Sequence, residues 1–79
     1  MEAYILINTK AGMLWKVAKA LLKSIYVKKA HAVTGQYDVI AFIEFDSIET
    51  LGRVINDIHA IEGVTKTQTA IAMPQRAID

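Results

Sequence analysis

The chain has 79 residues, a formal net charge of +1 and no cysteine. A single domain is expected at this length, and the near-neutral charge argues against a protein built mainly to bind nucleic acid, which needs a basic surface. The absence of cysteine excludes a disulfide framework and a thiolate metal site. Hydrophobic residues make up 53% of the chain, somewhat above the roughly 45–50% of soluble domains. We therefore expect self-association to cover part of this apolar surface.

Charged residues interrupt the apolar runs every few positions, so no run reaches the length of a transmembrane helix. The first residues lead directly into a strand pattern and lack the basic region that begins a signal peptide. We therefore expect a cytoplasmic protein in which residues 1–79 form one domain.

The first half of the chain predicts a strand, a helix and a second strand. Residues 4–7 form a short apolar strand pattern, and a helix opens after Ala11 or Gly12. Its apolar stripe has helical spacing and consists of Leu14, Val17, Ala18, Leu21, Leu22 and Ile25. Trp15 and three lysines lie off this stripe; a solvated surface explains the lysines, and Trp15 can pack on the flank of the core or contact a partner. The second strand is expected over residues 27–34.

A tight turn is predicted between the two apolar runs at the centre of the chain. Gly35 and Gln36 separate Thr34 from Tyr37, and a leading glycine in a two-residue loop is typical of a hairpin with positive φ at that position. Together with Asp38, these residues place a hydroxyl, an amide, a phenol and a carboxylate next to Gly35, whose backbone has no side chain to cover it. An ordinary turn explains the same residues. A carboxylate at this solvent-facing position is expected to contribute little to stability.

The third strand, over residues 37–45, is apolar at odd and even positions alike, as in a strand covered on both faces. Asp46 or Ser47 is expected to cap a second helix, with Glu49 three residues after Asp46 in the position of a capping box. Apolar residues from Ile48 to Ile58 give that helix one buried face. Gly63 is expected to end that helix, and residues 64–73 to form the last strand.

The order strand, helix, strand, strand, helix, strand predicts an α+β fold of the ferredoxin-like βαββαβ type, a four-stranded antiparallel sheet with two helices on one face. Two helices cover only one face of such a sheet, which leaves the other apolar face open. We therefore expect at least a dimer, with the sheets paired back to back as a dimeric α/β barrel. The contact face should bear part of the set Ile5, Ile7, Ile40 and Phe42.

Residues suited to catalysis or metal binding are sparse. His31 and His59 lie far apart without the spacing of a zinc site, and we expect structural or surface roles for both. No serine has a nearby base, and the glycines form no phosphate-binding loop. We therefore expect no catalytic residue, no metal and no cofactor. A small dimeric α/β-barrel enzyme, or a purely structural oligomer, is the alternative.

Two segments, VTGQYDVI at residues 33–40 and IEGVTKTQT at residues 61–69, resemble the effector domain of the Lrp/AsnC (feast/famine) transcriptional regulators, called the RAM domain. The resemblance extends over residues 3–73. Its motifs are the T-G-x-Y-D hairpin, a G-V pair before the last strand and alternating threonines on that strand. Regulators of this family carry an N-terminal helix-turn-helix domain, whereas this sequence begins at the first strand of the effector domain. It is therefore similar to the stand-alone RAM proteins, and we expect no direct binding to DNA.

The resemblance implies a non-catalytic sensor of a small molecule, usually an amino acid, that modulates transcription by assembling with itself or with full-length Lrp/AsnC-type regulators. In this family the effector binds where hairpins and last strands of neighbouring subunits meet, and rings of four dimers are common. The implied ligand-binding residues are Gly35, Gln36, Tyr37, Asp38, Thr67 and Thr69. A carboxylate such as Asp38 can hold an ammonium group, and bare backbone N–H groups or threonine hydroxyls can hold a carboxylate. β-Propensity alone also explains the threonines.

Overall fold

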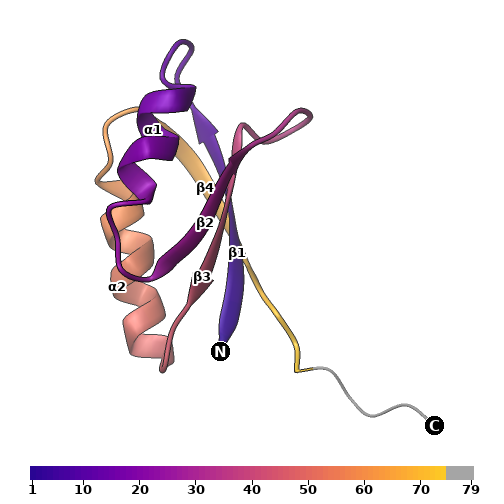
Figure 1. The fold of residues 1–79 in the computed structure, drawn as a ribbon, viewed down its shortest axis with the longest axis vertical. Helices are drawn as coiled ribbons and strands as arrows, with labels where there is room; N and C mark the ends of the chain where they lie inside the picture. The colour runs from indigo at the N-terminus through magenta and orange to yellow at the C-terminus, as the bar shows by residue number, and fades with distance from the viewer. Residues whose placement is uncertain (75–79) are drawn as a thin grey trace, which may run out of the picture.

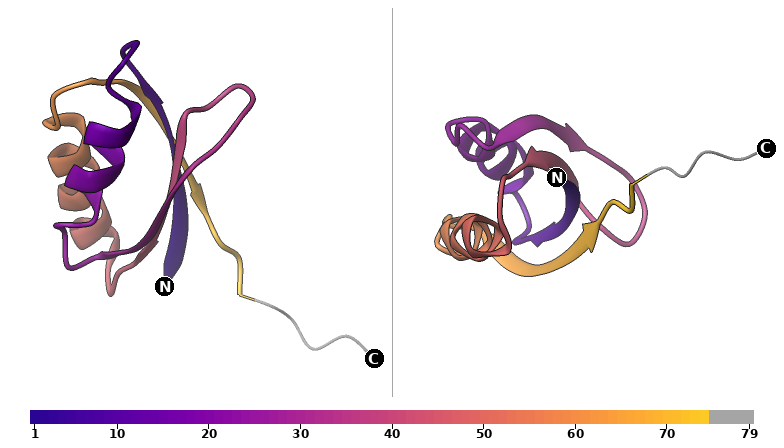
Figure 2. Two further views of the ribbon diagram at one scale, coloured as in Figure 1. Left: turned by 45° about the horizontal axis from the view of Figure 1, so that its top comes forward. Right: turned by 90° about the horizontal axis from the view of Figure 1, so that it is seen from below.

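The computed structural model describes residues 1–74. Its elements are β1 (Glu2–Thr9), α1 (Leu14–Leu21), β2 (Val27–Ala32), β3 (Val39–Glu44), α2 (Ile48–His59) and β4 (Val64–Ile71). The strands form one antiparallel sheet in the order β2-β3-β1-β4, and both helices cover the same face (Figures 1 and 2). This arrangement confirms the predicted ferredoxin-like fold. Within the described residues neither helix is long and apolar enough to cross a bilayer.

The core lies between the sheet and the two helices. Alternate residues of the central strands point at the helices and are fully buried, because each strand directs successive side chains to opposite faces. These residues are Ala3, Ile5, Ile7, Val39, Ala41 and Ile43. Val17 and Leu21 from α1, and Val54 and Ile58 from α2, pack against them. Ile5 and Ile7, predicted as part of an association set, are therefore covered within the chain.

The other face of the sheet carries the second apolar set of β1 and β3. We call it the open face; its residues are Tyr4, Leu6, Ile40 and Phe42. The register pairs Tyr4 with Phe42 and Leu6 with Ile40, so the four side chains form one patch opposite the helices. The predicted second apolar face is thus present, with Tyr4 and Leu6 in place of Ile5 and Ile7.

Helix α1 ends earlier than its apolar pattern predicted. The backbone N–H groups of Lys23 and Ser24 donate to carbonyls only three residues back, at 3.2 and 3.1 Å, which tightens the last turn as helix ends often do. The chain then leaves the helix axis to begin β2. As a result Ile25, predicted on the buried stripe, is 77% exposed. Leu22, also predicted there, is the C-cap residue and is 55% exposed.

Of the two residues predicted to cap α2, Asp46 and Ser47, the structure shows Ser47. Ser47 is the N-cap residue, and its hydroxyl oxygen accepts a hydrogen bond of 3.1 Å from the backbone N–H of Thr50. The two hydroxyl oxygens of Ser47 and Thr50 are also 3.1 Å apart. Because the helix begins at Ile48, Thr50 and not Glu49 is the third residue after the cap, and the predicted capping box of Asp46 and Glu49 does not form.

The connection between β2 and β3 is longer than the predicted two-residue turn. The last strand pair is Ala32 with Val39, and the last bond between the strands runs from the N–H of Val33 to the carbonyl of Asp38 at 2.9 Å. Residues 34–37 therefore form a four-residue loop. Gly35 has the predicted positive φ, at 110°. In Figure 1 the loop projects beyond the end of the sheet.

Candidate functional site

Asp38 lies where the pairing between β1 and β3 ends. Its N–H donates to the carbonyl of Ile7 at 2.9 Å, and its Oδ2 atom accepts from the N–H of Thr9 at 2.8 Å and from the Thr9 hydroxyl at 3.3 Å. The half-buried carboxylate thus takes the place of a strand partner for Thr9. Its Oδ1 atom makes no hydrogen bond within residues 1–74 and can accept one from a ligand.

Tyr37 and Gln36 fasten the rest of the loop to neighbouring strands. The phenol of Tyr37 donates to the side-chain oxygen of Gln68 on β4, and the side-chain amide of Asn8 donates to the carbonyl of Gln36 at 2.7 Å. A Cβ atom built on Gly35 would meet no atom within 4 Å. The loop is therefore held in place on one side while the backbone at its tip stays open to approach.

The two predicted threonines of β4 lie on the opposite face of the sheet from Gln68. Thr67 pairs with Ile7 and Thr69 with Ile5, and both isoleucines face the helices. The Thr67 hydroxyl is 2.5 Å from Nε2 of His59, which lies in the last turn of α2. This contact assigns His59 a structural partner, in agreement with the role expected for it.

Five of the six predicted ligand-binding residues lie toward one end of the sheet, whereas Thr69 pairs with Ile5 in the middle of β1; the six do not come together within a single chain. Ile7 lies between them, because its carbonyl accepts from Asp38 on one side and it pairs with Thr67 on the other. Two strand spacings separate Asp38 from Thr67, or roughly 10 Å. At this separation one small amino acid does not reach Asp38 and Thr67 of the same chain at once.

The sequence did not identify three residues that hold this end of the sheet together. Asn8 and Thr9 follow the first apolar run, and Gln68 stands between the threonines of β4. Each bonds to the hairpin across 28 to 31 residues of chain. The sequence signal for Asn8 and Thr9 was their position directly after an apolar strand. Their contact with the hairpin follows only from the strand order, which places β1 beside β3.

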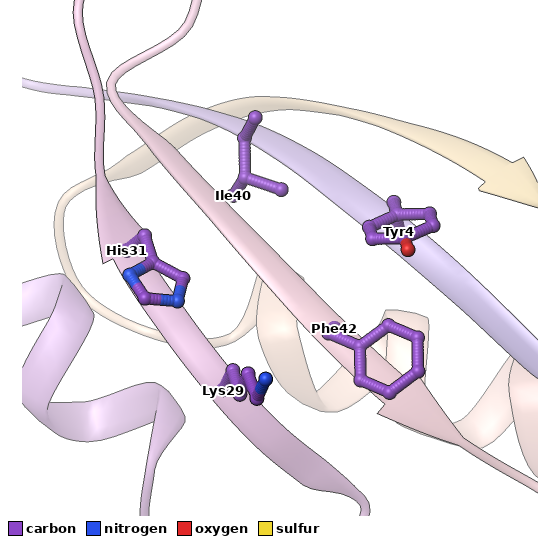
Figure 3. A pocket seen from close by; sticks show the side chains of 5 residues that line it. All are labelled: Tyr4, Lys29, His31, Ile40 and Phe42. Atoms are coloured by element: carbon purple, nitrogen blue, oxygen red, sulfur yellow. The ribbon is translucent and has the colours of Figure 1, made fainter.

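The open face contains a shallow hollow of about 230 Å³ (Figure 3). The rings of Tyr4 and Phe42 pack at a centroid distance of 5.2 Å and an interplanar angle of 49° and line it together with Ile40. Lys29 and His31 reach it from β2, where they pair with Phe42 and Ile40. The hollow is thus apolar at its base, with nitrogen-bearing side chains along one border.

The described residues hold no group of three or more His, Cys, Asp or Glu side chains that could bind a metal ion. Charged contacts are also few there: the one ion pair within residues 1–74 joins Lys16 to Glu62 at 3.1 Å, and both side chains are largely exposed. The hydrogen bond from Lys16 lowers the pKa of Glu62 below its ordinary value. This pair lies on the helix side of the molecule, away from the open face.

The family model of the Lrp/AsnC ligand binding domain matches residues 2–78. Among curated proteins, the chain is similar to the HTH-type transcriptional regulator FL11 of Pyrococcus furiosus, with 35% identity over 71 residues that cover 90% of this chain and 47% of FL11. The chain spans about half the length of the curated relatives it matches.

Two solved structures have similar folds over nearly their whole lengths. Hypothetical protein PHS023 from Pyrococcus horikoshii is 35% identical, with a TM-score of 0.85 over 94% of this chain and 90% of that one. TTHA0845 from Thermus thermophilus is 27% identical, with a TM-score of 0.90 over 98% of both chains.

These matches confirm the resemblance that the hairpin and the last strand indicated. Domains of this kind are regulatory modules of transcription regulators; they bind small-molecule effectors, are typically oligomeric and are not catalytic. The chain belongs to the Lrp/AsnC family and forms the ligand-binding domain of that family.

Proposed function

We propose that the chain senses a small amino acid and acts in the cytoplasm by ligand-dependent assembly with itself or with full-length Lrp/AsnC-type regulators. The observation that carries this proposal is the fixed hairpin at the end of the sheet. Thr9 holds one oxygen of Asp38, and the other oxygen is available to a ligand. Three residues before Asp38, at the tip of the loop, Gly35 exposes backbone without a side chain.

An amino acid fits these groups by charge. Its ammonium would bind Oδ1 of Asp38, and its carboxylate would bind backbone N–H groups around Gly35, because charge-assisted hydrogen bonds of this kind are the strong ones. Gln36 and Tyr37 belong to the same loop as Gly35. A second copy would supply Thr67 and Thr69, since those of the same chain lie beyond β1.

Assembly would use the open face. A second copy packed back to back would remove Tyr4, Leu6, Ile40 and Phe42 from water, and full burial of a side chain of this size is worth about 1.5–3 kcal/mol. A homodimer of this form is the unit we propose, and a ring of four dimers would bring hairpins of neighbouring dimers to β4 strands. Ligand binding between dimers would then favour the ring.

Residues 1–74 do not read DNA directly under this proposal. Sequence readout by a helix requires that one helix enter the major groove. Both α1 and α2 pack along the sheet with their apolar faces buried, and β2 and β3 separate them in the chain, so they do not form a helix-turn-helix pair that presents a recognition helix. A regulator that assembles with this chain would supply the DNA contacts.

A thermal-melt screen of the twenty amino acids tests the ligand. An amino acid at a hundred times its Kd stabilises the folded state by about 2.7 kcal/mol, which raises Tm by about 10–20 °C for a domain of this size. We expect one or a few amino acids to produce this shift. If none moves Tm, amino-acid sensing is refuted, and a purely structural oligomer becomes the better description.

Light scattering at micromolar concentration tests the assembly. We expect at least a dimer for the wild type and a monomer for Phe42→Glu, because a buried unpaired charge opposes contact between the open faces. Ile48→Glu is the matched control: Ile48 is 60% exposed at the start of α2, away from the open face, and its variant should keep the wild-type mass. A folded wild-type monomer would contradict the proposed dimer.

A further inference from the structure

The outer side of α1 carries large apolar side chains that neither the core nor the open face explains. Trp15 is 72% exposed and Leu22 is 55% exposed. Trp15 is the only tryptophan in the chain. Tryptophan is the residue type most often found at the energetic centre of protein–protein contacts, and its exposure calls for an explanation.

The helical spacing places Trp15 and Leu22 on one flank. Val17 and Leu21 define the buried side of α1, and Ala20 lines the groove toward α2. Trp15 and Leu22, seven residues apart, lie on the flank away from α2. Both helices stand on the sheet face opposite the open face (Figure 2), so a dimer formed through the open face leaves this flank in water.

Positive charge accompanies these apolar side chains. Lys16 and Lys19 lie on the exposed side of α1, and exposed Lys23 directly follows the C-cap residue Leu22; the helix contains no acidic residue. Glu62 pairs with Lys16, whereas Lys19 and Lys23 have no carboxylate within 4 Å among residues 1–74. We name this set the α1 outer surface: Trp15, Lys16, Lys19, Leu22 and Lys23.

We propose that the α1 outer surface docks an acidic amphipathic helix of a partner protein. Trp15 and Leu22 are two helical turns apart, about 10 Å along the axis, which matches two apolar positions on one stripe of a facing helix. Lys19 and Lys23 would meet acidic residues that border that stripe, since complementary charge at the rim of a contact steers association and fixes its register. This surface is separate from the hairpin and from the open face.

Other occupants fit the surface less well. Nucleic-acid binding at physiological salt rests on many phosphate contacts from a basic surface, and three lysines in a chain with a formal net charge of +1 supply too few. A helix that binds a membrane turns its main apolar face to the lipid, but that face of α1 is buried in the core. A second copy offers α2 as its remaining helix, but Arg53 lies one turn from both Glu49 and Asp57 on the exposed side of α2, so this guanidinium would oppose the lysines and leaves that side only weakly acidic.

Fluorescence of the single tryptophan tests this proposal with the full chain. The probe is a synthetic helix-forming peptide of about 18 residues, built from leucine, alanine and glutamate with leucine on one stripe and no aromatic residue. The control peptide has lysine at every glutamate. We expect the acidic peptide to shift the Trp15 emission to shorter wavelength with a saturable titration, and the lysine peptide to leave it unchanged.

Charge reversal on the protein completes the test. Lys19→Glu with Lys23→Glu should weaken binding of the acidic peptide by about tenfold or more. Lys10→Glu with Arg53→Glu changes the net charge equally at exposed positions off the α1 outer surface, and should weaken it much less. No shift with the acidic peptide, an equal response to both peptides, or equal losses in the two double variants would overturn the proposal. So would an emission shift produced only by anionic vesicles, by duplex DNA or by raising the concentration of the protein itself.

Discussion

Two substitutions at Asp38 separate its structural contribution from its charge. Asp38→Ala removes both hydrogen bonds to Thr9 and leaves a half-buried backbone N–H without its partner. Hydrogen bonds to a charged group are worth about 1.5–3 kcal/mol, so we expect the free energy of unfolding to fall by that amount. Asp38→Asn keeps a carbonyl oxygen that accepts from the Thr9 N–H, and should cost less than about 1 kcal/mol.

Urea denaturation followed by circular dichroism, at one fixed protein concentration because of the expected dimer, measures both variants. For a domain of this size the alanine variant should also melt about 6–24 °C below the wild type. Equal stabilities of the alanine and asparagine variants would refute the inference that Asp38 acts as the strand partner of Thr9. The two hydrogen bonds to Thr9 thus predict a larger contribution to stability than the sequence alone did.

Three further predictions concern the fold. Gly35 and Gly63 both have positive φ, at 110° and 100°, but a Cβ on Gly63 would lie 2.9 Å from Cβ of Met13, whereas one on Gly35 meets nothing within 4 Å. Gly63→Ala should therefore lower the free energy of unfolding more than Gly35→Ala, by about 1–3 kcal/mol in denaturant titrations. Equal losses would contradict the close contact at Gly63. Ser47→Ala should lower stability by about 1 kcal/mol through loss of the α2 cap, measured by calorimetry, and an unchanged Tm would count against the cap. The hydrogen bond from Lys16 lowers the pKa of Glu62 in the folded state, so this pair stabilises the fold at pH values above the ordinary glutamate pKa and loses that effect as pH falls through the folded pKa. An NMR titration of Lys16→Met should show the Glu62 pKa rising toward its ordinary value. No rise would exclude Lys16 as the cause.

The sequence predicted the architecture because its strongest signals are periodic. Ile40 and Phe42 alternate with Val39, Ala41 and Ile43, and this double pattern indicated a strand with two apolar faces, which the structure shows in the middle of the sheet. The end of α1 was predicted too late. Leu22 and Ile25 continue the helical period of apolar residues. That period does not show where the backbone hydrogen bonds change to a three-residue spacing and the chain leaves the helix axis.

The hairpin motif was recognised, but its contacts could not be predicted from local sequence. Thr9 bonds to Asp38 because β1 lies beside β3, and Gln68 meets Tyr37 because β4 lies beside β1. Such bonds depend on strand order, which turn propensities do not contain. The face occupied by Thr67 follows from its pairing with Ile7, and a shift of one residue would have placed it beside Tyr37 instead.

Calorimetric titration of the amino acid that raises Tm most, into the wild type and into Asp38→Asn, tests the proposed ligand site most directly. The asparagine variant keeps the bond to Thr9 but lacks the charge that would hold the ammonium group. We expect saturable heat from the wild type and a Kd at least about tenfold weaker in Asp38→Asn, because a charge-assisted bond is lost. Equal affinities, or no heat from the wild type with any amino acid, would contradict ligand binding by this hairpin.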